Sequence, residues 1–171
     1  MRIAVLASVD SWYVRDLQRA AGTRHSVEPL PFSKLRGTLG STEDVWVQDQ
    51  RLADYEALLV RTMPPGSLEQ VVFRMDLLQR LHSQGLVTIN PPKSVEAAVD
   101  KYLTLALLQE AGFRVPETDT SQTVDEAMEG FFRLRGDVVV KPLFGSEGRG
   151  ITRIQDEAIA LRTFKLLTQL G

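Results

Sequence analysis

The chain has 171 residues, of which 43% are hydrophobic and 25% charged, and its formal net charge is −2 at pH 7. The absence of cysteine excludes disulfides and thiolate catalysis, and the near-neutral charge gives no general attraction to nucleic acid or to an anionic membrane. No apolar stretch approaches the roughly 20 residues that a membrane span needs, and no signal peptide is apparent. We therefore expect a cytoplasmic protein that binds neither nucleic acid nor membrane.

The first half of the chain alternates short apolar runs with amphipathic segments. Helices are expected after Asp10 or Ser11, where Trp12, Val14 and Leu17 recur at apolar positions, and after Ser67. The second of these helices has the spacing of a capping box, because Gln70 stands three residues after Ser67. Strands are expected at 2–8, 26–30, 44–48, 57–62 and 86–90. Strands that alternate with helices predict an open parallel sheet of the α/β class.

Polar residues stand where two of these strands end. Arg61 and Thr62 close one strand, and Asn90 closes another. In open parallel sheets, ligands bind outside the carboxyl ends of the strands. Arg61 is therefore either a solvated strand terminus or a cation that faces a substrate, and Asn90 is a second candidate for substrate contact.

The pair Pro91-Pro92 marks a boundary, which divides the chain into domains 1–91 and 92–171. After it we expect a helix capped by Ser94 that ends at Gly112, and a strand that starts within 113–118. The remaining elements are a helix from Thr123 to about Arg135, a strand at 137–143, a return strand at 150–154 and a final helix after Asp156. Two strands joined by a short loop predict a small α+β unit with an antiparallel, glycine-rich hairpin.

The hairpin sequence KPLFGSEGRGI, residues 141–151, has glycine at 145, 148 and 150. Neither a P-loop nor a Rossmann fingerprint fits, because both require a helix after the glycines and here a strand follows. Glycine lets backbone N–H groups approach an anion closely. Lys141 follows three valines, where burial of its charge is costly unless an anion meets it. The segment is therefore either a plain turn or an anion-binding loop, and Ser146 and Arg149 are either solubilising residues or ligand contacts.

Two longer segments resemble the ATP-grasp superfamily, and more narrowly the RimK-like α-L-glutamate ligases. They are TINPPKSVEAAVDKYLTLALLQEAGFRVPET, residues 88–118, and VVVKPLFGSEGRGI, residues 138–151. The family pattern is a strand ending in Asn-Pro, a helix with Asp-Lys, then Leu-Leu, Gly and Val-Pro, followed by a VxKPxxGSxGxG hairpin. The matching residues are Asn90, Pro91, Asp100, Lys101, Leu107, Leu108, Gly112, Val115, Pro116, Lys141, Pro142, Gly145, Ser146, Gly148 and Gly150.

The resemblance implies an ATP-dependent carboxylate–amine ligase with ATP and Mg²⁺ as cofactors. ATP would phosphorylate a carboxylate to an acylphosphate, which an amine then attacks. Lys101 and Lys141 would contact the ATP phosphates, and the loop Gly145, Ser146, Glu147, Gly148, Arg149 and Gly150 would fold over them. Asp100 is interpreted as a helix-stabilising charge and Thr104 as structural. The implied partners are the nucleotide, a small-molecule or peptide carboxylate and an amino acid, and relatives often form homo-oligomers.

The resemblance covers only the front half of such a ligase. Domain 1–91 corresponds to the family's N-terminal, Rossmann-like domain, and 92–171 to the first, lid-forming subdomain. The residues that hold adenine and magnesium would belong to a second subdomain, so no metal ligand and no side-chain nucleophile is predicted here. We expect these 171 residues to bind nucleotide weakly and to be inactive alone. The alternative is a non-catalytic regulatory module that binds a nucleotide or a partner.

Overall fold

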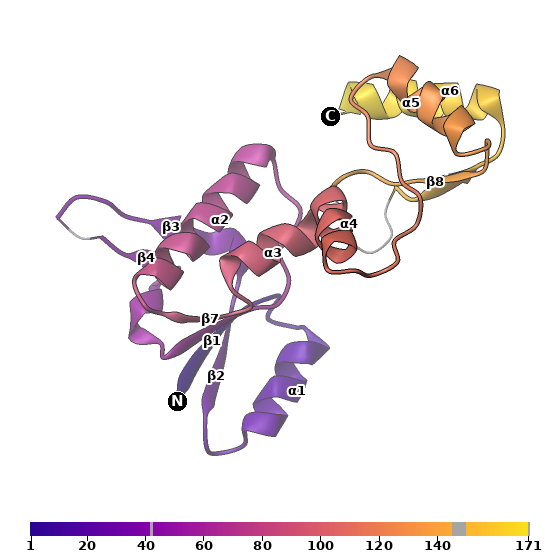
Figure 1. Cartoon of the computed structure of the whole chain (residues 1–171). Coiled ribbons are helices and arrows are strands. Elements are labelled where there is room, and N and C mark those ends of the chain that lie inside the picture. Colours follow the sequence, from indigo (N-terminus) through magenta and orange to yellow (C-terminus); the bar gives the residue numbers. More distant parts are fainter. Residues whose placement is uncertain (42, 145–149, 171) are drawn as a thin grey trace. The chain divides into compact units, whose positions relative to one another are not determined.

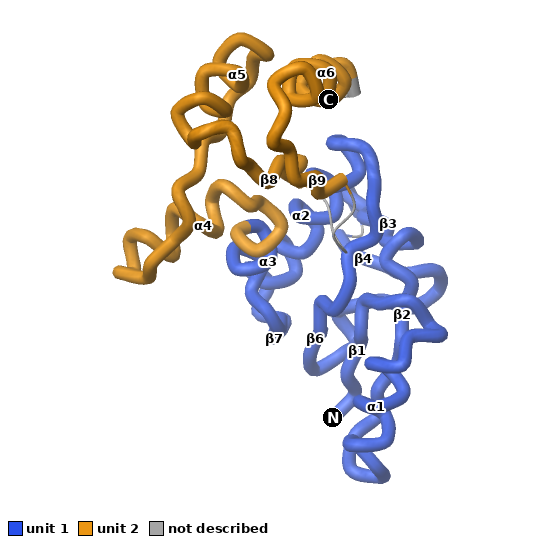
Figure 2. Tube along the Cα trace, turned by 90° about the vertical axis from the view of Figure 1, so that its right-hand side faces the viewer, with its two compact units in different colours: residues 1–96 blue, residues 97–171 orange. Residues whose placement is uncertain are grey.

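The computed structural model describes residues 1–41, 43–144 and 150–170. The chain divides into two compact units, residues 1–96 and residues 97–171 (Figure 2). The division lies inside helix α3 (Pro92–Val99), which begins at the proline pair. Each unit has its own hydrophobic core, so each is described by itself.

Unit 1 is built on a four-stranded parallel sheet. Its strands lie in the order β2 (Ser26–Leu30), β1 (Arg2–Leu6), β6 (Ala57–Val60) and β7 (Val87–Ile89). β1 pairs with β2 on one side and with β6 on the other, in parallel register throughout. The strand order therefore reverses at β1, which makes the carboxyl ends of β1 and β6 the topological switch point of the sheet.

Helices lie on both sides of the parallel sheet (Figure 1), and alternate residues of β1 belong to the two separate clusters packed there. Val5 packs with Val14 of helix α1 (Trp12–Ala21) on one face. Ala4 and Leu6 belong to a larger cluster on the other face, which includes residues of helix α2 (Leu68–Ser83). Side chains of a strand alternate between faces, so a run that is apolar throughout, such as IAVLA, is suited to a sheet covered on both sides.

A small antiparallel sheet completes the larger core of unit 1. It comprises β3 (Leu35–Gly37), β4 (Val45–Val47) and β5 (Gln50–Arg51), with short 3-10 turns at Phe32–Lys34 and Leu52–Asp54. Val45 and Val47 are buried on either side of Trp46, which confirms the alternation seen in the sequence. This strand pairs with β3 and β5 and not with the parallel sheet.

Unit 2 pairs a short hairpin with helices. Its elements are α4 (Lys101–Glu110), α5 (Val124–Arg133), β8 (Val138–Val140), β9 (Thr152–Ile154) and α6 (Glu157–Leu170). β8 and β9 are antiparallel, as predicted. Phe131, Ile154 and Ala160 form the buried core, with Val138 and Val140 packed against it. The hairpin is thus anchored by one apolar face, and the α+β character predicted for this half is confirmed.

Three sequence predictions in the second half are wrong. The single helix expected from Ser94 to Gly112 is two helices, because the chain leaves helical geometry at Asp100, with ψ of 110°. No strand forms at 113–118, where the backbone is irregular and Phe113 is exposed. The strand expected over 137–143 ends at Val140, since Pro142 lacks the N–H that a continuing ladder needs.

Candidate functional site

Lys101 contacts the segment after Lys141 within unit 2. Its hydrogen-bond partner is Leu143, which lies 42 positions further along the chain. Lys101 is the first residue of α4 and is half-buried. Its Nζ donates a hydrogen bond to the backbone carbonyl of Leu143 at 3.2 Å, and its backbone N–H points to the same oxygen at 3.4 Å. The Lys101 ammonium therefore lies beside the segment that follows β8, two residues beyond Lys141.

The residues around Lys101 set the start of its helix. Asp100 is the N-cap of α4, and its carboxylate accepts a hydrogen bond from the Leu103 N–H at 2.9 Å. Thr104 donates from Oγ1 to the carbonyl of Ala97 at 2.5 Å, which ties α4 to the end of α3. Both interactions agree with the structural roles expected for Asp100 and Thr104. They hold Lys101 in the first turn, where the positive end of the helix dipole adds to the charge of its ammonium.

The described part of the hairpin brings its two strand ends together. Gly150 has φ of 75°, and a Cβ at this position would lie 3.2 Å from Cγ of Pro142. The conformation and the close approach both favour glycine. Gly145, Ser146, Glu147, Gly148 and Arg149 lie outside the described residues.

Lys141 follows β8 directly and is exposed. The expectation that burial makes its charge costly is therefore wrong, because the strand ends earlier than the apolar pattern suggests. Because Lys141 is exposed, desolvation of its charge gives no reason for a phosphate contact. Such a contact has to be argued from the residues around Lys141.

In unit 1, Arg61 stands at the carboxyl edge of the parallel sheet. Its backbone N–H donates to the carbonyl of Leu6 at the end of β1, at 3.1 Å. Its guanidinium lies over the ring of Tyr13, 4.2 Å from the ring centroid. The rings of Tyr13 and Trp12 lie with centroids 4.1 Å apart, and Trp12 is 59% exposed, so this tryptophan does not lie on the buried face of α1 as its spacing suggests. Sequence analysis identifies Arg61 but not its aromatic neighbours, because helical periodicity gives no sign of this contact.

Asn90 follows β7, which pairs with β6 next to it, and is exposed. Because parallel strands end at the same edge, Arg61 and Asn90 both lie at the carboxyl edge of the sheet. The nucleotide-binding candidates belong to unit 2 and these two substrate candidates to unit 1.

The strongest electrostatic coupling in unit 1 lies toward the amino ends of the strands. The Glu28 carboxylate accepts hydrogen bonds from Arg2 at 2.9 and 3.0 Å and from the Tyr55 hydroxyl at 2.6 Å. These bonds, from Arg2 first, lower the pKa of Glu28 to about 2, while burial and the Glu28 contact raise the pKa of Tyr55 to about 12. The cluster links β1, β2 and the residues just before β6. We interpret it as structural, because it lies at the edge of the sheet opposite the carboxyl ends of the strands.

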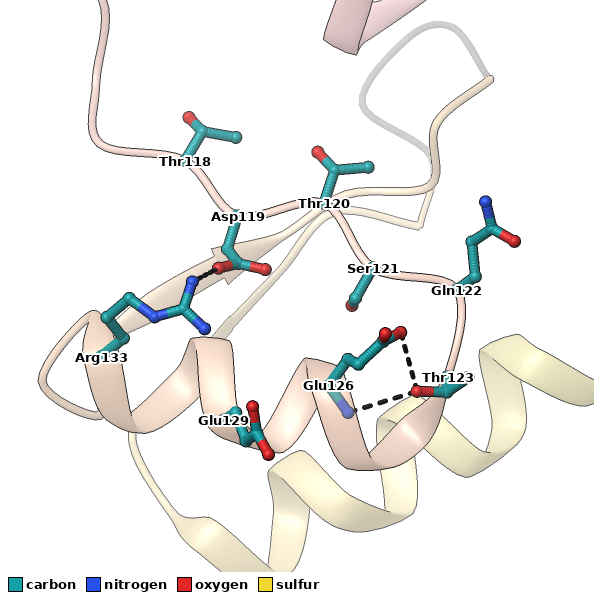
Figure 3. A pocket seen from close by; sticks show the side chains of 9 residues that line it. All are labelled: Thr118, Asp119, Thr120, Ser121, Gln122, Thr123, Glu126, Glu129 and Arg133. Atoms are coloured by element: carbon teal, nitrogen blue, oxygen red, sulfur yellow. Dashed lines mark hydrogen bonds and ion pairs between the residues drawn. The ribbon is translucent and has the colours of Figure 1, made fainter.

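An open concavity of about 750 Å³ lies in unit 2 between α5 and the segment before it (Figure 3). Asp119 is ion-paired with Arg133, and the Thr123 hydroxyl caps α5 and also contacts the Glu126 carboxylate. Several polar side chains that line this concavity therefore already take part in helix capping or in an ion pair. Of the predicted nucleotide-binding residues that the structure describes, Lys101, Lys141 and Gly150, none lines it. The lining residues are Thr118, Asp119, Thr120, Ser121, Gln122, Thr123, Glu126, Glu129 and Arg133.

Across the described residues, no three His, Cys, Asp or Glu side chains are grouped so that they could hold a metal ion. Nor does the described part of the chain include a helix with the length and apolar character needed to cross a membrane.

Comparison of sequences identifies ligases as relatives. A tetrahydromethanopterin:alpha-L-glutamate ligase of Methanosarcina acetivorans is 40% identical over 111 residues, which are 63% of this chain and 33% of that protein. The ligase of the same name from Methanococcus maripaludis is 26% identical over 96% of this chain and 57% of its own length. A glutathione synthetase of Shewanella oneidensis is 30% identical over 72% of this chain and 38% of its own length. The chain thus spans between about a third and just over half of these relatives. No family model matches it.

Solved structures share the fold. The crystal structure of a RimK domain ATP-grasp protein from Sphaerobacter thermophilus aligns over 97% of this chain and 59% of its own, with a TM-score of 0.72 and 21% identity. The ATP-grasp ligase PsnB, solved with a minimal precursor, Mg and ADP, aligns over 97% of this chain and 62% of its own, with a TM-score of 0.61 and 20% identity. The parallel sheet and the small antiparallel sheets match the N-terminal portion of such ligases. The chain is thus similar in sequence to glutamate ligases and glutathione synthetases, and it shares the fold of the N-terminal portion of ATP-grasp ligases.

Proposed function

We propose that the chain forms the phosphate-binding part of an ATP-dependent carboxylate–amine ligase of the glutamate-ligase type. Unit 1 corresponds in this proposal to the N-terminal α/β domain of the family, and unit 2 to the lid subdomain. Relatives at 26% and 40% identity carry the name of alpha-L-glutamate ligases, and PsnB was solved with Mg and ADP. The substrates would be ATP, a carboxylate and an amino acid.

The observation that supports the proposal is the position of the Lys101 ammonium beside the carbonyl of Leu143. Both the ammonium and the backbone N–H of Lys101 donate to the carbonyl of Leu143, so the start of α4 and the segment that carries Lys141 converge within one unit. Gly150, at positive φ and close to Pro142, is a position that favours glycine, as the resemblance to the family hairpin implies.

Lys101 and Lys141 provide cations that suit a triphosphate, whereas no cluster among the described residues suits its metal. Lys101, Lys141 and the amides of segment 145–150 would orient the phosphates and stabilise the negative charge on the group being transferred. ATP supplies the phosphoryl group that activates the carboxylate. No metal-ligand cluster exists among the described residues, so we assign Mg²⁺ no ligand here.

Calorimetric titration of the 171-residue chain with ATP tests the proposal. We expect weak, saturable binding, because two lysines and a glycine-bearing segment do not enclose adenine. Lys101→Met and Lys141→Met should each weaken binding about ten-fold, since a charge-assisted hydrogen bond contributes roughly 1.5–3 kcal/mol. Lys165→Met, which removes an exposed lysine from α6 of the same unit, is the matched control and should leave the affinity unchanged.

Two results would contradict the proposal. Equal ATP affinity in the Lys101, Lys141 and Lys165 variants would mean that the nucleotide does not lie at the hairpin. Turnover of ATP with micromolar affinity by these residues alone would show that the site is complete without a second subdomain. Binding that depends on both lysines but gives no turnover is the expected outcome.

A further inference from the structure

A small cavity of about 180 Å³ lies in unit 1 between the end of α2 and the start of α3. It is lined by Gln79 and His82 of α2 and by the run Pro91, Pro92 and Lys93, which leads into α3. A single water molecule needs roughly 10–15 Å³ of such space. The cavity therefore has room for a small ion.

A buried hydroxyl fixes the tautomer of His82. The imidazole Nδ1 lies 2.8 Å from Oγ1 of Thr88, a residue of β7 that is only 6% exposed. Among the described residues, Nδ1 is the only hydrogen-bond partner of the Thr88 hydroxyl. A buried hydroxyl without an acceptor is costly, so the Thr88 O–H donates to Nδ1 and the ring proton is on Nε2. His82 therefore offers a donor, and not a lone pair, at the nitrogen that remains free.

The lining of the cavity carries one positive charge and no negative one. Within the described part of the chain, neither the Lys93 ammonium nor the side-chain amide of Gln79 has a hydrogen-bond or ion-pair partner. Asp76 and Glu96, one helical turn from Gln79 and Lys93, are exposed and do not line the cavity. The Lys93 charge is therefore available to an anion that enters the cavity.

The backbone carbonyls at the end of α2 are already paired. Those of Arg80, Leu81 and His82 accept hydrogen bonds from the N–H groups that follow the helix, at positions 84, 86 and 85. Unpaired carbonyls at a helix end would favour a cation. With these carbonyls occupied, the groups left free at the cavity are donors.

We propose that this cavity binds a phosphate group, held by the Lys93 ammonium, the Nε2–H of His82 and the side-chain amide of Gln79. Three donors on separate side chains suit a tetrahedral oxyanion, and lysine binds phosphate as a point charge. Arginine, whose parallel N–H groups match a planar carboxylate, is not in the lining. Inorganic phosphate and the phosphate group of a small metabolite share this chemistry. The site lies in unit 1, whereas the lysines proposed to contact ATP belong to unit 2.

The test is a titration of the ¹⁵N-labelled 171-residue chain with sodium phosphate, followed by NMR at constant pH, with the ionic strength held by sodium chloride. We expect saturable shifts at the Lys93 amide and at the ring nitrogens of His82. Lys93→Met should weaken phosphate binding about ten-fold or more, the fold-change expected for loss of a charge-assisted contact. Lys34→Met removes the other lysine of unit 1, which is also exposed, and is the matched control for net charge.

Gln79→Leu provides a second variant that leaves the net charge unchanged. Gln79 is exposed on α2 and leucine is a good helix former, so the variant should fold, as judged by unshifted amides of the parallel sheet. We expect phosphate affinity to fall several-fold, because one neutral hydrogen bond is lost. In the parent chain, the ¹⁵N shifts of the His82 ring should place its proton on Nε2.

The proposal is overturned if neither inorganic phosphate nor glycerol 3-phosphate gives saturable shifts at the cavity, or if Lys93→Met and Lys34→Met bind phosphate equally well. Acetate that binds as tightly as phosphate, or a His82 ring proton on Nδ1, would also overturn it. The tighter binder of the two phosphate compounds identifies the ligand as the free ion or as a phosphate ester. These titrations contain no nucleotide, whereas the ligase proposal is tested by ATP binding in the Lys101 and Lys141 variants. Failure of one is therefore distinguishable from failure of the other.

Discussion

Replacement of Asp100 by alanine should destabilise α4 by about 1 kcal/mol. The carboxylate of Asp100 accepts the Leu103 N–H at 2.9 Å and is the only side-chain cap of this helix among the described residues. Loss of an N-cap costs roughly 0.5–2 kcal/mol, and loss of a negative charge from the first turn adds roughly 0.3–1 kcal/mol. Because Lys101 is the first residue of the same helix, fraying of this turn should also release its ammonium from the Leu143 carbonyl and lower the affinity for ATP.

Amide hydrogen exchange measures this effect locally. A loss of about 1 kcal/mol should reduce protection of the α4 amides roughly five-fold, while amides of the parallel sheet stay unchanged. Asp100→Asn is the matched control, because asparagine caps as well as aspartate and loses only the charge. If Asp100→Asn reduced exchange protection as much as Asp100→Ala does, the capping role would be refuted. If Asp100→Asn abolished ATP binding with protection intact, Asp100 would act on the ligand and not on the helix.

Two further predictions concern stability. Hydrogen bonds from Arg2 and then Tyr55 lower the pKa of Glu28 from 4.5 to about 2. The stabilisation of the folded state by Glu28 is therefore fully present above pH 4.5 and is lost as the pH falls through 2. The urea midpoint should fall over this pH range, and Glu28→Gln should flatten its pH dependence. A slope that is identical in the variant would contradict the coupling. Ile154→Ala, at a buried position of β9, should cost about 2–5 kcal/mol by denaturant unfolding, whereas Ile151→Ala, 43% exposed, should cost less than about 0.5 kcal/mol. Equal losses at the two positions would show that β9 is not anchored by its inner face.

Local sequence signals located most of the elements of unit 1. The run IAVLA is apolar on both faces because both faces of β1 are covered, and it is recognisable without any partner strand. The capping box of Ser67 and Gln70 marks the start of α2, and it is present with both hydrogen bonds. Such signals depend on neighbours within four residues, so the sequence contains all the information they need.

Local periodicity misplaced two features. One continuous helical pattern across residues 94–111 is broken because Asp100 turns its carboxylate back to cap α4, while Thr104 bonds across the break to Ala97. Trp12 has the spacing of a core residue but lies exposed beside Tyr13. Periodicity gives the face of a helix and does not give its rotation against the sheet, which depends on all the side chains packed between them.

The sequence by itself indicated the resemblance to ATP-grasp ligases, the alternation of strands and helices, and the two lysines and glycines that resemble a nucleotide-binding motif. Only the tertiary structure brought the Lys101 ammonium to the carbonyl of Leu143 and placed the Arg61 guanidinium over the ring of Tyr13. A motif is a pattern of residue types along the chain, which local conformation and chemistry are enough to specify. Contacts between residues far apart in sequence depend on which backbone segments the core holds together. Burial of apolar surface in the whole unit, and not any local preference, determines which segments these are.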